Sequence, residues 1–191
     1  EYANIHRGIY ELSSKLTKRY EDSRLSVSKF INSPSYENII FTKSATEGIN
    51  LVSSCLSDKY FNDGDEILLT SLEHHANLVP WHLVSKKIKI ITAEIKPTGE
   101  LDYNDLLEKI NSKTKFLAIT HMSNVTGSII NFDEIKIKAN KFNVPILIDG
   151  CQYVPHKKLS ITELDPDFYV FSAHKLYGPS GLGVLYMKSK W

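Results

Sequence analysis

The segment from Phe171 to Gly183, FSAHKLYGPSGLG, places a lysine directly after a histidine, between a short apolar run and a loop that contains three glycines. A lysine in a loop usually reaches solvent, but a lysine held out of water beside other cationic groups can attack a carbonyl carbon and form a Schiff base. A Walker-type phosphate loop does not fit, because the lysine precedes the glycines and no Gly-Lys-Ser/Thr follows. We predict that Lys175 holds an aldehyde and that the glycines make room for it.

Asp149 is the last residue of a strongly apolar run, VPILID. A carboxylate at such a position is costly without a partner. A backbone cap or a lysine would satisfy it, and so would the cationic nitrogen of an aromatic ring. A pyridoxal ring needs an acid opposite its nitrogen in order to act as an electron sink. With a Schiff-base lysine near another strand end, the cationic ring is the better interpretation of Asp149.

Further polar residues suit the remaining parts of such a ligand. Thr46 opens the helix expected after NIIFT, and helix N-termini bind phosphate. Ser172 and His174 would add a hydroxyl group and a ring nitrogen. Ser44 or Thr46 could also simply cap the helix, and the two interpretations are compatible.

His74 and His75 raise the question of a metal site. Adjacent histidines cannot both face one metal from a regular helix, and no cysteine or carboxylate pattern supports zinc, so we predict no metal. A flat imidazole at His74 fits stacking on a cofactor ring better. Asn124 and Gln152 could hydrogen-bond a ring hydroxyl. The residues together match one small molecule, pyridoxal 5′-phosphate.

Strand and helix patterns alternate along the chain, which predicts an α/β fold with a mostly parallel sheet covered by helices on both faces. In such sheets ligands bind beyond the carboxyl ends of the strands, and polar clusters follow several of them, including one with His121, Ser123 and Asn124. The expected strands are 38–42, 66–70, 87–95, 115–120, 144–149, 168–172 and 183–187. The expected helices are 8–31, one beginning with ATEGINLVSSCL, 76–86, 103–110 and 132–142.

The composition is that of an ordinary globular protein. The 191 residues carry a net charge of +1 and are 42% hydrophobic, which suits one domain with its own core. The charge gives no argument for nucleic acid, and no apolar run is long enough to span a membrane. Two cysteines suit a reducing compartment, so we expect a cytoplasmic protein. The chain begins at Glu1, so we expect missing residues before it, and an organellar leader stays open.

The motifs FTKSATEGIN, EHHANLVPW, THMSNVTG, LIDGCQ and FSAHKLYGPSGLG resemble, in order, the cysteine desulfurases of the SUF type within the class V aminotransferases. The resemblance covers essentially the whole chain, and HRGIYELS near its start also fits. EHHAN and HKLYGP favour the SUF-type group. The implied fold is the large domain of fold type I pyridoxal-phosphate enzymes, with residues 1–191 as a cofactor-binding domain that is incomplete at both ends.

The resemblance implies a role for each matching position. Lys175 would be the Schiff-base lysine, Asp149 the partner of the pyridine nitrogen and His74 the stacking group. The remaining roles fall to Gln152 at the ring hydroxyl, Asn124 near the substrate, and Thr46, Ser172 and His174 at the phosphate. The implied reaction converts L-cysteine to L-alanine and passes sulfur as a persulfide to a SUF-type acceptor protein for iron–sulfur cluster assembly. L-selenocysteine is a possible substrate, and the full-length enzyme would be a homodimer.

The chain departs from the family pattern in what it lacks. The sulfur-accepting cysteine and the arginine that binds the substrate carboxylate fall beyond this segment in the family, so we expect the segment alone to be inactive. Cys55 is expected in the core, and Cys151 stands where the family more often has alanine. Other class V enzymes, such as a selenocysteine lyase, an epimerase or an aminotransferase, and a non-catalytic cofactor-binding relative are the alternatives.

Overall fold

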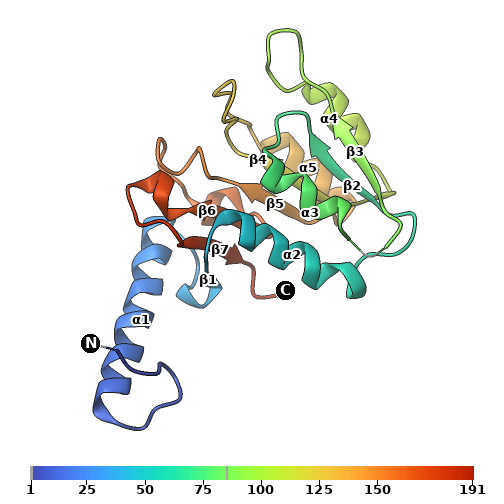
Figure 1. Ribbon diagram of the computed structural model, residues 1–191. Coiled ribbons are helices and arrows are strands. Elements are labelled where there is room, and N and C mark those ends of the chain that lie inside the picture. The colour runs from blue at the N-terminus through green and yellow to red at the C-terminus, as the bar shows by residue number, and fades with distance from the viewer. Residues whose placement is uncertain (1, 85) are drawn as a thin grey trace.

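A computed structural model describes residues 2–84 and 86–191 of the chain, and these residues form a seven-stranded sheet with helices against it (Figure 1). The strands are β1 Ile39–Thr42, β2 Glu66–Thr70, β3 Lys89–Ala93, β4 Thr114–Thr120, β5 Ile146–Asp149, β6 Phe168–Ser172 and β7 Gly183–Met187. The α-helices are α1 Glu11–Phe30, α2 Ala45–Lys59, α3 Val79–His82, α4 Tyr103–Lys109, α5 Asp133–Lys141 and α6 Ile161–Leu164. Short 3₁₀ helices are η1 Tyr36–Asn38, η2 His75–Asn77 and η3 Ala173–Leu176.

The strand order is β1-β7-β6-β5-β4-β2-β3. Strands β2 to β6 pair in parallel, whereas β7 runs antiparallel to both of its neighbours, β1 and β6. Because β7 alone is reversed, β1 runs in the same direction as the parallel strands. The carboxyl ends of six strands therefore meet at one edge of the sheet.

Alternate residues of the strands face two separate hydrophobic clusters, as the two-residue period of a strand requires. In β5, Ile146 and Ile148 pack in the cluster that contains residues of α4 and α5. Leu147 between them packs in the cluster that contains residues of α2 and the indole of Trp81 in α3. Helices thus cover both faces, which explains the continuous apolar runs and confirms the predicted fold class.

Most strand boundaries match the sequence patterns within two residues, but the helix expected over 76–86 is wrong. The described part of that segment holds η2 and the four-residue α3, whose backbone hydrogen bonding ends at Leu83. The side chain of His74 caps η2, and Pro80 stands at the start of α3, where a missing N–H is tolerated. Residue 85 lies outside the described residues.

Helix α1 begins at Glu11 rather than at residue 8 and projects away from the sheet, with the N-terminus near its outer part (Figure 1). The C-terminal half of α1 meets the rest of the fold, where Val27 packs against the core. Among the described residues, no helix is long and apolar enough to cross a membrane.

Candidate functional site

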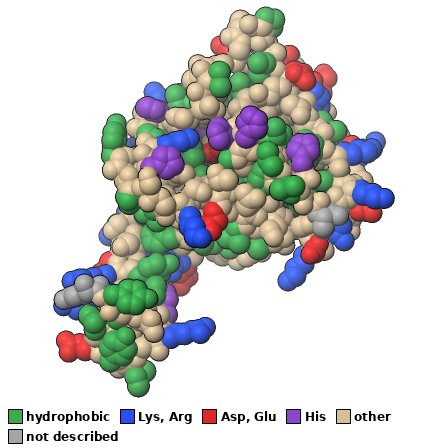
Figure 2. Space-filling view, viewed as in Figure 1, with side chains coloured by type: hydrophobic (Ala, Val, Ile, Leu, Met, Phe, Trp, Pro, Cys, Tyr) green, Lys and Arg blue, Asp and Glu red, His purple; other side chains and the backbone are tan. Residues whose placement is uncertain are grey.

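The candidate site lies at the shared carboxyl edge of the strands, on the side of the sheet that α2 covers. Thr42 of β1 and Ser172 of β6 both pair with Gly183, and Asp149 of β5 pairs with Thr120 of β4. Two of these strand ends, Asp149 and Ser172, are themselves residues predicted for the site. Figure 2 shows histidine side chains gathered on the face viewed in Figure 1, with a basic and an acidic side chain among the residues below them.

Asp149 is buried, with 5% of its surface exposed. The backbone N–H of Cys151 donates a hydrogen bond of 3.0 Å to its Oδ1. The described residues supply no ion pair to this carboxylate. A buried acid with one neutral donor retains the capacity to accept a charge-assisted hydrogen bond, so the position fits the protonated nitrogen of a pyridine ring.

The start of α2 is joined to β6 through the Ser172 side chain. Ala45 N–H donates to the Ser172 hydroxyl at 2.9 Å, and Glu47 N–H donates to the hydroxyl of Ser44 at 3.1 Å. Among the described residues, no acceptor is recorded for the N–H of Thr46. This N–H and the Ser172 hydroxyl hydrogen are donors at a helix N-terminus, which is the donor set that a phosphate group needs.

Gly183 explains why β7 can pass so close to this turn. A Cβ at Gly183 would overlap the backbone of Ser44. Gly181 has a φ of +79°, in the left-handed region that favours glycine. These two glycines therefore serve the close approach and turning of the chain itself, a local reason that the sequence pattern did not reveal.

Lys175 lies in η3, directly after β6, and is half-buried. Its positive charge lowers the pKa of the Cys151 thiol, whereas burial and the negative charge of Asp149 raise that pKa to about 12, with burial the largest cause. Asp149 ends β5 and Lys175 follows the neighbouring strand β6, so both residues lie at the same edge of the sheet. The site therefore combines an amine, a buried acid and a helix N-terminus.

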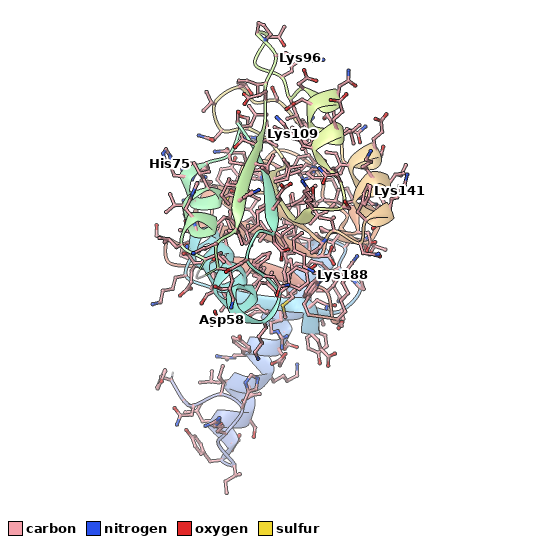
Figure 3. The ribbon with its side chains drawn as sticks, turned by 90° about the vertical axis from the view of Figure 1, so that its right-hand side faces the viewer. Asp58, His75, Lys96, Lys109, Lys141 and Lys188 are labelled. Atoms are coloured by element: carbon pink, nitrogen blue, oxygen red, sulfur yellow. The ribbon has the colours of Figure 1, made fainter. Side chains whose placement is uncertain are left out.

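His74 is the N-cap residue of η2, and its Nδ1 accepts the N–H of Ala76 at 3.1 Å. An Nδ1 that accepts must be unprotonated, so the ring carries its proton on Nε2. The rings of His74 and His75 are perpendicular, with centroids 6.3 Å apart. Figure 3 shows His75 at the outer surface of the molecule.

The other predicted site residues follow the same sheet edge. Thr46, Asn124 and His174 are exposed, and Gln152 is half-buried. Hydrogen bonds within the described residues link Asp149 and Ser172 to Cys151, and link Ser172 to the first turn of α2, while Lys175 follows Ser172 along the chain. None of these recorded contacts joins His74, Gln152, Asn124 or His174 to that group.

His121 does not belong with the polar residues that were expected at the end of β4. It is 6% exposed and packs with Phe132 and Tyr169, in the cluster on the α5 side of the sheet. Its Nδ1 lies 2.9 Å from the Tyr169 hydroxyl oxygen, and its ring stacks on Tyr153 with centroids 3.5 Å apart. Burial lowers the pKa of His121 to about 3, so the ring is neutral at physiological pH.

The expectation that Cys55 lies in the core is wrong, because this thiol is exposed. Helix α2 buries the face that carries Val52 and Leu56, and Cys55 lies outside that face. It lines an apolar groove of about 450 Å³ together with Tyr60 and Trp191. Cys151, in contrast, is buried, as small-residue packing predicted.

Comparison with known proteins places the chain in a family. The aminotransferase class-V family matches residues 1–191, and the chain belongs to it. A cysteine desulfurase of Wigglesworthia glossinidia brevipalpis is 46% identical over 194 residues, covering 100% of this chain and 47% of that protein. One from Serratia proteamaculans is 45% identical, covering 97% of this chain and 46% of that protein.

Solved structures agree in fold. The cysteine desulfurase CsdA of Escherichia coli has a TM-score of 0.87 at 38% identity, covering 98% of this chain and 48% of that one. The apo cysteine desulfurase of Thermococcus onnurineus NA1 has a TM-score of 0.91 at 37% identity, covering 98% and 47%. The chain therefore spans about half the length of the relatives that it matches.

Proposed function

We propose that the chain is the cofactor-binding large domain of a pyridoxal-phosphate-dependent cysteine desulfurase, which forms L-alanine from L-cysteine and transfers the sulfur. The observation that supports the cofactor most directly is Asp149, a buried carboxylate with one neutral donor, at the end of the strand next to the one that Lys175 follows. The named relatives are cysteine desulfurases at 45% and 46% identity, and they support the choice of reaction.

Each residue has a part that its surroundings suit. Lys175 would hold the cofactor's aldehyde carbon, and Asp149 would accept a hydrogen bond from the ring nitrogen. The Thr46 N–H, the Ser172 hydroxyl and His174 would hold the phosphate. His74 would cover the ring, while Gln152 would contact its hydroxyl and Asn124 would lie toward the substrate. Pyridoxal phosphate supplies an electron sink for charge that develops on the substrate.

The finer identity rests on the motifs. EHHAN at 73–77 and HKLYGP at 174–179 favour a SUF-type desulfurase. On that basis we propose that a SUF-type acceptor protein receives the sulfur for iron–sulfur cluster assembly, and that the full-length enzyme is a homodimer. Selenocysteine lyase is the second candidate, because L-selenocysteine differs from L-cysteine only in the chalcogen atom.

The attachment residue can be tested in the full-length protein by Lys175→Ala. We expect the variant to lose the visible absorption band of the bound cofactor and to yield no borohydride-reduced cofactor peptide. Lys141→Ala is a matched control, because Lys141 lies in the last turn of α5, which leads into the amino end of β5 at the opposite edge of the sheet (Figure 3). A reducible cofactor adduct that persists in Lys175→Ala would show that another residue holds the cofactor.

The acid can be tested by Asp149→Asn. The amide keeps the size of the side chain but loses the charge that holds a proton on the ring nitrogen. We expect the variant to bind the cofactor and to turn over L-cysteine about 10- to 100-fold more slowly, the scale of a lost charge-assisted hydrogen bond. Alanine release measures turnover, and a near-normal rate would contradict this role of Asp149.

A further inference from the structure

The carboxylate of Glu73 joins three separate elements at the candidate site. The Thr70 hydroxyl at the end of β2 donates to Oε1 at 2.6 Å, and the Thr120 N–H at the end of β4 donates to the same oxygen at 2.9 Å. The amide Nδ2 of Asn77 in η2 donates to Oε2 at 2.6 Å. Glu73 is the first residue of the motif EHHAN, but neither the sequence analysis nor the proposed chemistry gives it a role.

The donors around Glu73 cannot exchange roles. The Trp81 indole N–H, which can only donate, donates to Oδ1 of Asn77 at 3.3 Å, and both residues are fully buried. The Asn77 amide must therefore present its Nδ2 to Glu73. The Thr120 N–H is also only a donor. Both oxygens of residue 73 must consequently accept hydrogen bonds. A carboxyl group meets this requirement in either protonation state, because the hydroxyl of the acid can donate to the Thr70 oxygen and still accept, whereas the nitrogen of an amide cannot accept.

The same network holds the backbone that carries His74. Asn77 N–H donates to the His74 carbonyl oxygen at 2.8 Å, and Ala76 N–H donates to the His74 Nδ1. The Glu73 side chain thus fixes Asn77, which in turn closes the turn around His74. Burial, together with the negative charge of Asp149, raises the pKa of Glu73 to about 8, so the carboxyl group is mostly protonated at neutral pH.

We propose that Glu73 is a positioning residue that sets the orientation and tautomer of the His74 imidazole by fastening the turn at residues 73–77 to the ends of β2 and β4. This proposal deepens the proposed function, because it assumes that His74 is the residue that covers the cofactor. Its own observable, the state of the His74 ring, does not depend on the cofactor.

The test compares Glu73→Gln with the double variant Glu73→Gln/Asn77→Asp in the full-length protein. In the single variant, an amide N–H meets a donor at Asn77 or Thr120, so one hydrogen bond is lost. In the double variant, the new amide at position 73 donates to the new carboxylate at position 77, which still accepts the Trp81 N–H. All hydrogen-bonding partners are then satisfied.

The primary measurement is the His74 imidazole signal in nuclear magnetic resonance spectra of cofactor-free protein with labelled histidine, assigned by the loss of that signal in His74→Gln. Glu73→Gln should reduce the Nε2-protonated tautomer of His74, and the double variant should restore it. Cofactor affinity should fall about tenfold in the single variant, the scale of one lost buried hydrogen bond, and recover to within about twofold in the double variant.

Asp102→Ala is the control, because Asp102 accepts two backbone N–H bonds at the start of α4 and has no hydrogen bond or ion pair to the turn at 73–77 among the described residues. It should lower stability without changing the His74 signal. A normal His74 tautomer in folded Glu73→Gln would overturn the proposal. If Glu73→Gln does not fold, the double variant decides: a native His74 signal supports the proposal, and an altered signal or an unfolded protein overturns it. Failure to bind pyridoxal phosphate in the parent protein would instead count against the proposed function.

Discussion

At the scale of single residues, the surroundings of Cys151 decide whether its sulfur is a thiol or a thiolate. The sulfur lies beside the buried hydroxyl of Ser172, at 3.9 Å between Sγ and Oγ. Burial and Asp149 raise its pKa to about 12 despite the opposing charge of Lys175. A thiol rather than a thiolate therefore stands at this position at neutral pH, and a thiol is a poor nucleophile.

We accordingly predict that Cys151→Ser leaves the proposed sulfur transfer nearly unchanged in the full-length enzyme. The change replaces a buried thiol with a slightly smaller hydroxyl that has Ser172 within reach as a partner. Sulfide and alanine released from L-cysteine measure the activity, with Cys55→Ser as a control at the exposed thiol. Loss of activity in Cys151→Ser, with the cofactor still bound, would make Cys151 the sulfur acceptor.

The residues that the sequence could and could not predict differ in how local their signals are. Asp149 and Lys175 stand out because each lies at or just after the end of an apolar strand. Glu73 gave no such signal, since its partner Thr120 is 47 positions away and only the sheet brings the two together. His121 gave a misleading signal, because it also follows a strand, but its place in the alternation points it to the other face of the sheet.

At the scale of elements, Gly150 links β5 to β6 beneath the site. A Cβ at this position would overlap the ring and hydroxyl of Tyr169. Tyr169 is fully buried and its hydroxyl meets His121, so the ring has little freedom to move aside. The glycine in the motif LIDGCQ therefore has a packing role that fixes the backbone next to Asp149.

We predict that Gly150→Ala lowers the free energy of unfolding by about 1–3 kcal/mol, the usual cost of overpacking a rigid core. Gly48→Ala is the matched control: its added Cβ would meet a single methyl group of Val170 at 3.1 Å, and alanine favours the helix α2. We expect that change to be nearly neutral. Urea unfolding measures both, and equal stability of Gly150→Ala and the parent would contradict the packing role.

The strands were predicted more accurately than the segment between β2 and β3. Strands β2, β6 and β7 were correct to the residue, whereas β5, which is buried at every position, begins at Ile146 rather than at residue 144. The helix expected over 76–86 failed because its apolar residues serve two short turns. One of these turns is stabilised by the side chain of His74 and the other starts at a proline, and periodicity detects neither feature.

At the scale of the whole molecule, two groups held away from water at the same sheet edge respond to pH in opposite ways. The pKa of His121 falls from 6.5 to about 3, so the folded protein binds fewer protons than the unfolded protein between these values. This contribution to stability is complete above pH 6.5 and is lost as the pH falls toward 3. The pKa of Glu73 rises from 4.5 to about 8, so its contribution is complete below pH 4.5 and is lost as the pH rises toward 8.

The two contributions to the free energy of unfolding change in opposite directions between pH 4.5 and 6.5. The pH dependence of the parent protein's stability therefore does not show either contribution by itself. A difference between the parent and His121→Gln isolates the histidine, because Glu73 is common to both and the glutamine can still hydrogen-bond the Tyr169 hydroxyl. We predict that the unfolding free energy of the parent minus that of the variant grows by about 1.4 kcal/mol per pH unit between about pH 4 and 6. It should become constant above about pH 7. Urea unfolding at several pH values measures this difference, and a difference independent of pH would show that His121 is not buried as a neutral ring.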